Sequence, residues 1–245
     1  MIQLYHWEPG PNSGEVLICL EEKGIDFESR YVDVLALEQF APDFLDMNPA
    51  GQVPVLVHDG KVVTETGFIL QYLEAVFPNP SLTPASAQDR YWVNVWIKYV
   101  NEYIAPAVWR LGVARQGLAL SAPLELERAP LERRQAWNKA RAGFSNDELE
   151  IAKALLPIRL ERMEQALGGS GWLAGPAVSL ADVAVFPTAR VLPVLTPDLV
   201  NAEATPGVTA WIERMKSRPA VQAALAMARH SQTMFAPGPE GSRWG

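Results

Sequence analysis

Two polar residues stand where the first apolar stretch of the chain gives way to a helical pattern. Asn12 and Ser13 follow the breakers of residues 9–11 and open a helix expected over residues 13–23. A hydroxyl or amide donor at a helix N-terminus can hydrogen-bond an anion such as a thiolate, and the helix dipole adds a favourable field. The same residue types are also ordinary N-caps. The residues alone therefore leave an anion site and a simple cap both open.

A second polar pair, Glu65 and Thr66, begins another expected helix. The hydroxyl and backbone N–H of Thr66 could bind a carboxylate, and the carboxylate of Glu65 could pair with an ammonium group. An acidic first turn is also common in helices without any ligand. Between the two pairs lies Val53-Pro54, which the residues alone indicate as an edge-strand proline.

Cysteine and histidine chemistry of the chain itself is not indicated. The single cysteine, Cys19, falls inside the first expected helix within an apolar run and reads as a core residue. One cysteine excludes an internal disulfide framework. The histidines at positions 6, 58 and 230 are scattered without the spacing of a zinc site, so no metal is expected.

Composition narrows the class of partner. The 245 residues carry a net charge of -7, which is a poor match to a nucleic acid. The N-terminus lacks a basic region followed by an apolar stretch, and no apolar run approaches the roughly 20 residues that span a bilayer. We therefore expect a cytoplasmic protein with no membrane or nucleic-acid partner.

The first 80 residues have the pattern of a mixed sheet. A strand over 2–7, a helix over 13–23 ended by Gly24 and a strand over 27–34 predict a parallel βαβ unit. Asp59-Gly60 between two apolar runs predicts a hairpin, and a helix follows over 65–77. This order predicts an α/β thioredoxin-like domain over residues 1–80.

Beyond a Pro-rich linker at 78–87 the apolar period becomes helical. Helices are expected over 91–111, 149–167, 180–191 and 208–217, with a kink at Pro106. Residues 115–146 are charged and irregular, which predicts a loop or short-helix insertion. We thus expect an all-α second domain over residues 88–235.

Several segments in this order resemble glutathione transferases. Residues 51–56 (GQVPVL) resemble the family's G-x-V-P-x-L segment, and residues 65–69 (ETGFI) resemble its E-S-x-x-I segment. Residues 179–182 (SLAD) resemble the capping box of its central helix, where Asp182 would be structural. Positions 205–221 resemble its C-terminal pattern. The resemblance covers nearly the whole chain and implies the glutathione transferase fold.

The resemblance implies a glutathione site in the first domain. Ser13 or Asn12 would stabilise the glutathione thiolate, with Ser13 slightly preferred. A cis-Pro54 would expose the main chain of Val53 to the cysteinyl backbone of glutathione. The resemblance also implies contacts to both ends of glutathione. Glu65 and Thr66 would bind its γ-glutamyl group, and Gln39 and Gln52 would bind its glycyl carboxylate.

The second domain would hold a small hydrophobic or aromatic electrophile. Aromatic side chains suit flat phenolic ligands, and four of them are candidates for this pocket: Trp7, Tyr103, Trp109 and Trp137. For any one of them, plain packing is the simpler interpretation. The resemblance also implies a homodimer.

Within the family, residues 9–13, 59–65 and 137–144 (WNKARAGF) are similar to bacterial glutathione-dependent β-aryl etherases. This similarity implies cleavage of aryl ethers in lignin-derived dimers, with release of a phenol. Two alternatives stay open. One is a general glutathione transferase, peroxidase or disulfide-bond reductase, and the other is a non-catalytic binder that has kept the fold.

Overall fold

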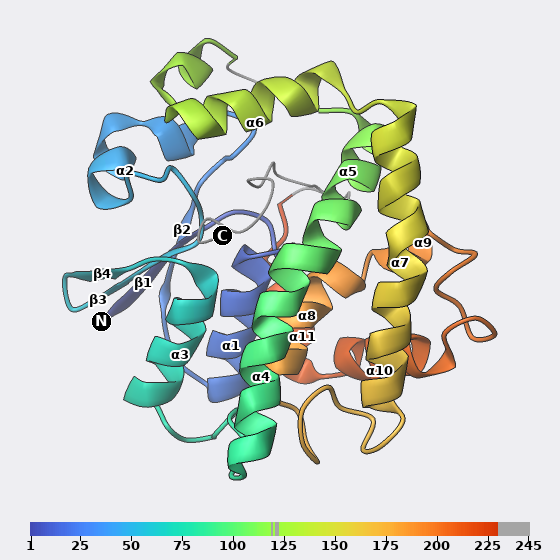
Figure 1. Cartoon of the computed structure of the whole chain (residues 1–245). Coiled ribbons are helices and arrows are strands. Elements are labelled where there is room, and N and C mark those ends of the chain that lie inside the picture. The colour runs from blue at the N-terminus through green and yellow to red at the C-terminus, as the bar shows by residue number, and fades with distance from the viewer. Residues whose placement is uncertain (119, 121–122, 230–245) are drawn as a thin grey trace.

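The computed structural model describes residues 1–118, 120 and 123–229. Its first part is a small four-stranded sheet with helices packed on it (Figure 1). The strands lie in the order β2-β1-β3-β4, with β1 and β2 parallel and the other pairs antiparallel. The bounds are β1 Ile2–His6, α1 Ser13–Lys23, β2 Glu28–Tyr31, α2 Pro42–Met47, β3 Val55–His58, β4 Lys61–Val63 and α3 Thr66–Val76.

Local signals account for most of this part. Asp59 (φ 50°) and Gly60 (φ 77°) form the predicted turn between β3 and β4, since both positions need the left-handed region. Gly24 ends α1 with φ 61°, as predicted. The strand predicted over 27–34 is shorter, because only Glu28–Tyr31 pairs with β1.

Helix α1 forms the centre of the molecule. Residues 16–20 of α1 are fully buried, and they include Cys19. Burial raises the pKa of the Cys19 thiol to about 12, which leaves it protonated and confirms its place in the core. At the other end, a Cβ on Gly14 would lie 2.9 Å from the Pro9 carbonyl and 3.2 Å from the Pro187 side chain. Helix α1 therefore approaches both its preceding loop and helix α8 at van der Waals contact.

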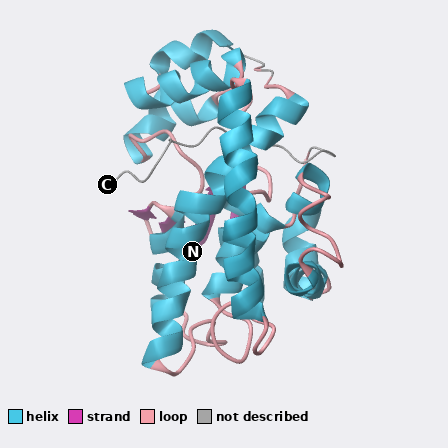
Figure 2. Cartoon of the chain, turned by 45° about the vertical axis from the view of Figure 1, so that its right-hand side comes forward, coloured by secondary structure: helices cyan, strands magenta, loops and turns pink. Residues whose placement is uncertain are grey.

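The rest of the described chain is helical, as the view in Figure 2 shows. A π-helical segment, Val100–Ile104, joins α4 to α5 without a break in the helical run, and Pro106 follows it in the first turn of α5. The bounds are α4 Ala87–Tyr99, α5 Ala105–Gln116, α6 Leu131–Ala142, α7 Asn146–Leu167, α8 Leu180–Ala189, α9 Leu192–Leu195, α10 Pro206–Lys216 and α11 Pro219–Ala226.

The region predicted as an irregular insertion is more regular than its sequence suggested. It holds a 3-10 segment, Pro123–Arg128, and the three-turn helix α6, which crosses the top of Figure 1. Three of its side chains pack into a hydrophobic cluster of the sheet part. The members of this bridging cluster are Trp7, Val34, Leu37, Phe40, Leu126, Ala129 and Trp137. The sequence left a loop and a short helix both open here, because the apolar residues of α6 contact another part of the chain instead of forming a local stripe.

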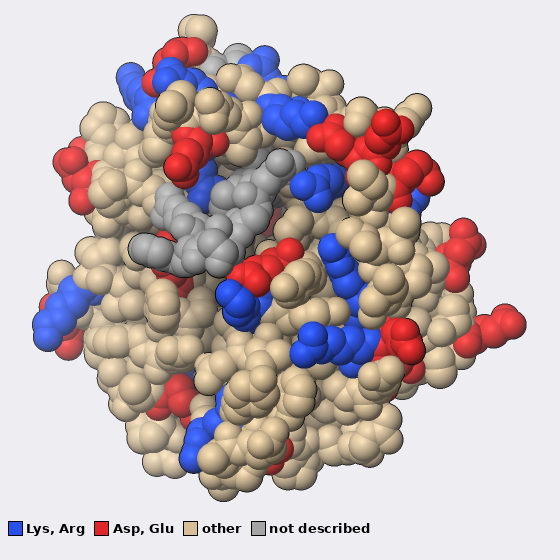
Figure 3. All heavy atoms as spheres, viewed as in Figure 1, with Lys and Arg blue, Asp and Glu red and all other residues tan. Residues whose placement is uncertain are grey.

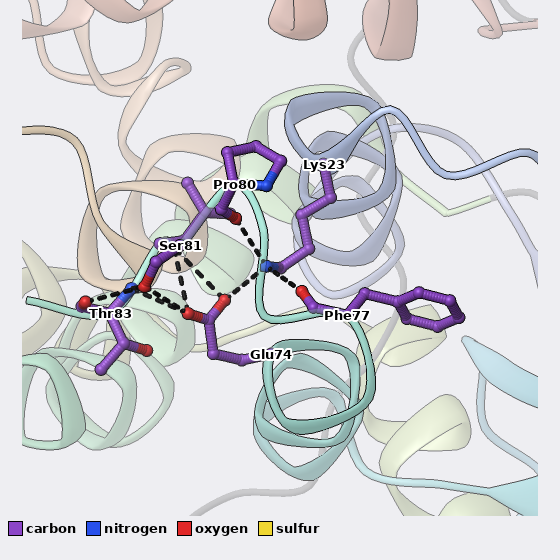
Figure 4. A network of polar contacts seen from close by, with 7 residues as sticks. Lys23, Glu74, Phe77, Pro80, Ser81 and Thr83 are labelled. Carbon is purple, nitrogen blue, oxygen red and sulfur yellow. Dashed lines mark hydrogen bonds and ion pairs between the residues drawn. The ribbon is translucent and has the colours of Figure 1, made fainter.

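A buried polar network holds the start of the linker at the carboxyl end of α1 (Figure 4). The buried amine of Lys23 lies 2.6 Å from a carboxylate oxygen of Glu74 and donates to the carbonyls of Phe77 and Pro80, each at 2.8 Å. Glu74 accepts further hydrogen bonds from the Ser81 hydroxyl and from the linker backbone. This network fixes the start of the predicted linker against α1 and α3.

Charges of both signs are interspersed on the face drawn in Figure 3, without a continuous basic patch. Among the described residues, none of the helices combines the length and the apolar character needed to cross a bilayer. Within the same residues, no group of His, Cys, Asp and Glu side chains is arranged to hold a metal ion.

Candidate functional site

Ser13 begins α1 and is only 2% exposed. Its Oγ accepts a hydrogen bond from the backbone N–H of Trp7 at 3.1 Å. A hydroxyl can also donate one hydrogen bond, and no described residue accepts a hydrogen bond from the Ser13 hydroxyl. The Trp7 bond thus orients Ser13 and leaves its O–H able to donate to an anion at this end of the helix.

Asn12 precedes α1 with the unusual backbone angles φ 68° and ψ -71°. Its side chain is exposed and makes no cap hydrogen bond, while its backbone N–H donates to Glu15 Oε1 at 3.2 Å. A non-glycine residue in this region is strained, and such strain concentrates at functional sites.

Glu15 is a fully buried carboxyl in the first turn of the same helix. Desolvation raises the pKa of Glu15 to about 8. The hydrogen bond from the Asn12 backbone lowers this pKa, but by less than desolvation raises it. Its Oε2 has no hydrogen-bond partner in the described residues. At neutral pH Glu15 is therefore mostly protonated, and it adds little negative charge beside Ser13.

Glu15→Gln is expected to stabilise the protein increasingly as pH rises from about 4.5 to about 8. In that window the unfolded chain ionises Glu15 while the folded chain keeps it protonated, so wild-type stability falls as pH rises. At pH 8 the penalty removed is of the order of a few kcal/mol. Denaturant unfolding of both proteins at pH 5 and pH 8 measures it. A difference that does not change with pH would contradict this account.

The Val53-Pro54 bond is cis, as the resemblance implied. Val53 lies just before β3, whose first residue, Val55, is opposite Tyr5 of β1. Within the described residues, the N–H and C=O of Val53 make no hydrogen bond. Backbone groups left in this way can pair with an extended ligand as a short added strand.

Glu65 and Thr66 meet at the N-terminus of α3, as predicted. Glu65 has φ 66° and ψ 113°, a conformation rare for a non-glycine residue, and its carbonyl accepts from the N–H groups of Phe68 and Ile69. Among the described contacts, the Thr66 N–H has no acceptor. A strained residue beside an open helix N-terminus is a suitable place for a carboxylate.

The two glutamines differ in their surroundings. Gln39 is buried, and its Nε2 lies 3.5 Å from the Val34 carbonyl. Its Oε1 has no partner in the described residues. Gln52 is half-buried, and its carbonyl accepts from Asn48 Nδ2 at 2.9 Å. The role of both in binding a glycyl carboxylate stays a prediction.

The four candidate aromatic residues do not form one cluster. Trp7 and Trp137 both belong to the bridging cluster. Trp109 packs edge-on against Phe144, with the ring centroids 5.0 Å apart. Tyr103 is 45% exposed and lies against Tyr99. Only Trp7 and Trp137 are therefore brought together, and a pocket shared by all four stays a prediction.

Sequence reasoning missed the residues that hold the loop between β1 and α1. Glu8 accepts hydrogen bonds from the Tyr31 hydroxyl at 2.5 Å and from the backbone N–H of Arg229, 221 positions away. On the other side, Arg190 donates to the Pro9 carbonyl at 3.3 Å. No local pattern pairs residues so distant in the chain.

Family models match both parts of the chain. The N-terminal domain of glutathione S-transferases matches residues 1–75, and their C-terminal domain matches residues 126–219. Among curated relatives, Protein LigF of Sphingobium sp. (strain NBRC 103272 / SYK-6) is 37% identical over 235 residues, covering 90% of this chain and 91% of LigF. Glutathione S-transferase 3 of Zea mays is 30% identical, covering 92% and 93%.

Solved structures agree. The crystal structure of the β-etherase LigF from Sphingobium sp. strain SYK-6 superposes with a TM-score of 0.86 over 93% of this chain and 99% of that one. A glutathione transferase family member from Pseudomonas fluorescens Pf-5, with two glutathione molecules bound, is 26% identical, with a TM-score of 0.71 over 91% and 92%. The chain belongs to the glutathione S-transferase family, with glutathione as its cosubstrate.

Proposed function

We propose that this protein is a glutathione-dependent β-etherase that acts on lignin-derived aromatic ethers. The observation that carries the chemical step is the geometry of Ser13, whose acceptor side is occupied by Trp7 and whose donor faces no described partner. The choice of substrate is supported by the likeness to LigF, which extends over nearly the full length of both chains.

The proposed reaction is a substitution at carbon. The glutathione thiolate attacks the carbon that lies beside a ketone and carries the aryl ether oxygen. A carbon–sulfur bond forms, the carbon–oxygen bond breaks, and the electron pair of the broken bond leaves with the phenolate, which takes a proton from solvent. The protein contributes by holding the sulfur as a thiolate and by placing the two reactants in contact.

The proposed site for the tripeptide follows the open backbone groups. Val53 would pair with the cysteinyl residue, and the cis-Pro54 bond fixes this turn. Thr66, with its unused N–H, would bind the γ-glutamyl carboxylate, while Glu65 would pair with its ammonium group. The electrophile would lie beyond Ser13, toward the aromatic side chains of the bridging cluster.

The test is direct measurement of phenol release from a β-aryl ether ketone in the presence of glutathione. We expect release with at least one enantiomer, together with a glutathione thioether of the other fragment. A protein that conjugates a simple aryl halide but releases no phenol from either enantiomer would be a general transferase. Retention on immobilised glutathione without any turnover would indicate a non-catalytic binder.

We further propose a cytoplasmic homodimer. Large apolar side chains remain exposed on neighbouring elements, including Phe68 of α3, which is 62% exposed, and Tyr91 of α4. A stripe on α7 adds Ile151, Leu155 and Ile158 at helical spacing. Exposed large apolar side chains of this kind support association with a second copy.

A further inference from the structure

Arg190 is a cation without a matching anion. It lies just after α8, its side chain is half-buried, and its Nε is shielded from solvent without a hydrogen-bond partner. Within the described residues it makes one hydrogen bond, to the Pro9 carbonyl, and no ion pair. A shielded charge without a counter-charge is costly, so the fold retains Arg190 at a price in stability.

The surroundings of Arg190 place it beside the start of α1. A Cβ on Gly14 would lie 2.9 Å from this same Pro9 carbonyl and 3.2 Å from the Pro187 side chain of α8, so Gly14 packs closely between the two. One carbonyl group therefore separates the guanidinium from the first turn of α1. Ser13 belongs to this turn.

The other charged groups around this end of α1 do not cancel that charge. Glu15 is mostly protonated at neutral pH, and burial lowers the pKa of His6, which leaves its ring uncharged there. Glu8 accepts from the Tyr31 hydroxyl and from the backbone N–H of Arg229. The Arg229 guanidinium lies over the same Tyr31 ring at 3.9 Å, so a second cation lies close to the Glu8 carboxylate. The ion pairs of α1 lie at its opposite end: Lys23 with Glu74, and Glu22 with Arg218.

We propose that Arg190 is a positioning residue that also supplies the positive charge favouring the glutathione thiolate at Ser13. Through the Pro9 carbonyl it fixes the loop that leads into α1. Its charge lies where an anion at Ser13 would compensate it, which explains a cation kept without a carboxylate partner. This inference depends on the proposed function, because it assigns the counter-anion to the thiolate.

A purely structural role is the alternative, since a cation at the carboxyl end of α8 also interacts favourably with that helix dipole. The two roles differ in what they do to the bound thiol. A structural role affects folding and all kinetic constants alike. If the role is electrostatic, removing the charge of Arg190 raises the pKa of the bound glutathione thiol. Replacing Arg190 with another cationic residue then leaves this pKa nearly unchanged.

The experiment measures the ultraviolet absorbance of the glutathione thiolate bound to the full chain as a function of pH. Arg190→Gln, which keeps an N–H donor for Pro9, is expected to raise the pKa of the bound thiol by about one unit. At pH values below the wild-type pKa, a rise of one unit lowers the fraction of bound thiolate tenfold. Arg190→Lys should stay near wild type. Arg90→Met is the control, because Arg90 is an exposed arginine that also donates to a loop carbonyl, that of Ala85.

An Arg190→Gln protein that binds glutathione with an unchanged thiol pKa would overturn the inference, whatever its rate. Arg190→Met provides the same measurement if the glutamine variant does not fold. If wild type itself develops no thiolate absorbance on binding glutathione, the proposed function fails instead. The two failures are thus separate results.

Discussion

Ser13→Ala is expected to lower kcat/KM for glutathione-dependent turnover roughly a hundredfold, the usual cost of losing one preorganised donor to a developing or full anion. The hydroxyl that faces no described acceptor disappears, and the pKa of the bound thiol rises. The Trp7 N–H also loses its acceptor, so a smaller part of the effect comes from the loop. Steady-state kinetics together with a thiolate titration measure both quantities.

Asn12→Ala is the matched comparison. Its backbone N–H keeps the bond to Glu15, because only the exposed side chain changes. We expect this variant to retain most of the activity. If Asn12→Ala loses the thiolate and Ser13→Ala does not, the donor is the asparagine amide.

Asp182→Ala is expected to destabilise the protein by about 4 kcal/mol, the range for breaking a buried hydrogen-bonded network. The carboxylate is fully buried in the first turn of α8. It accepts four hydrogen bonds: from the Leu173 N–H, from the N–H and hydroxyl of Ser179, and from Trp211 Nε1. Removing it strands several buried donors at once. Denaturant unfolding gives the loss.

Two further variants sharpen this test. Asp182→Asn keeps the shape but turns an amide toward existing donors, so it should also destabilise the fold. Glu148→Ala removes the corresponding acid of another capping box, at the start of α7, where the carboxylate is only half-buried. Its effect should be much smaller. Equal losses from Asp182→Ala and Glu148→Ala would mean that burial of the network contributes nothing.

The sequence predicted those features that depend on neighbours in the chain. The Asp59-Gly60 turn, the end of α1 at Gly24 and the core position of Cys19 each follow from a few adjacent residues. The pairs at residues 12–13 and 65–66 were found for the same reason, because each marks a helix start.

Features that depend on distant contacts could not be found in this way. Helix α6 has few apolar residues of its own, and its Trp137 packs into a cluster completed by residues far earlier in the chain. The burial of Gln39 has the same origin. The hydrogen bond from Arg190 to the Pro9 carbonyl joins positions 181 residues apart, and no sequence pattern around either residue predicts it.

The bridging cluster also has a consequence for how the protein unfolds. Leu37 and Phe40 come from the sheet part, yet side chains from the helical part cover them, Leu126 and Trp137 among them. A fragment ending near residue 80 would leave this apolar surface facing water. If the fragment ended before Pro80, Lys23 would also lose the carbonyl to which it donates there. We therefore expect the two family domains to unfold as one cooperative unit, and neither to be stable on its own.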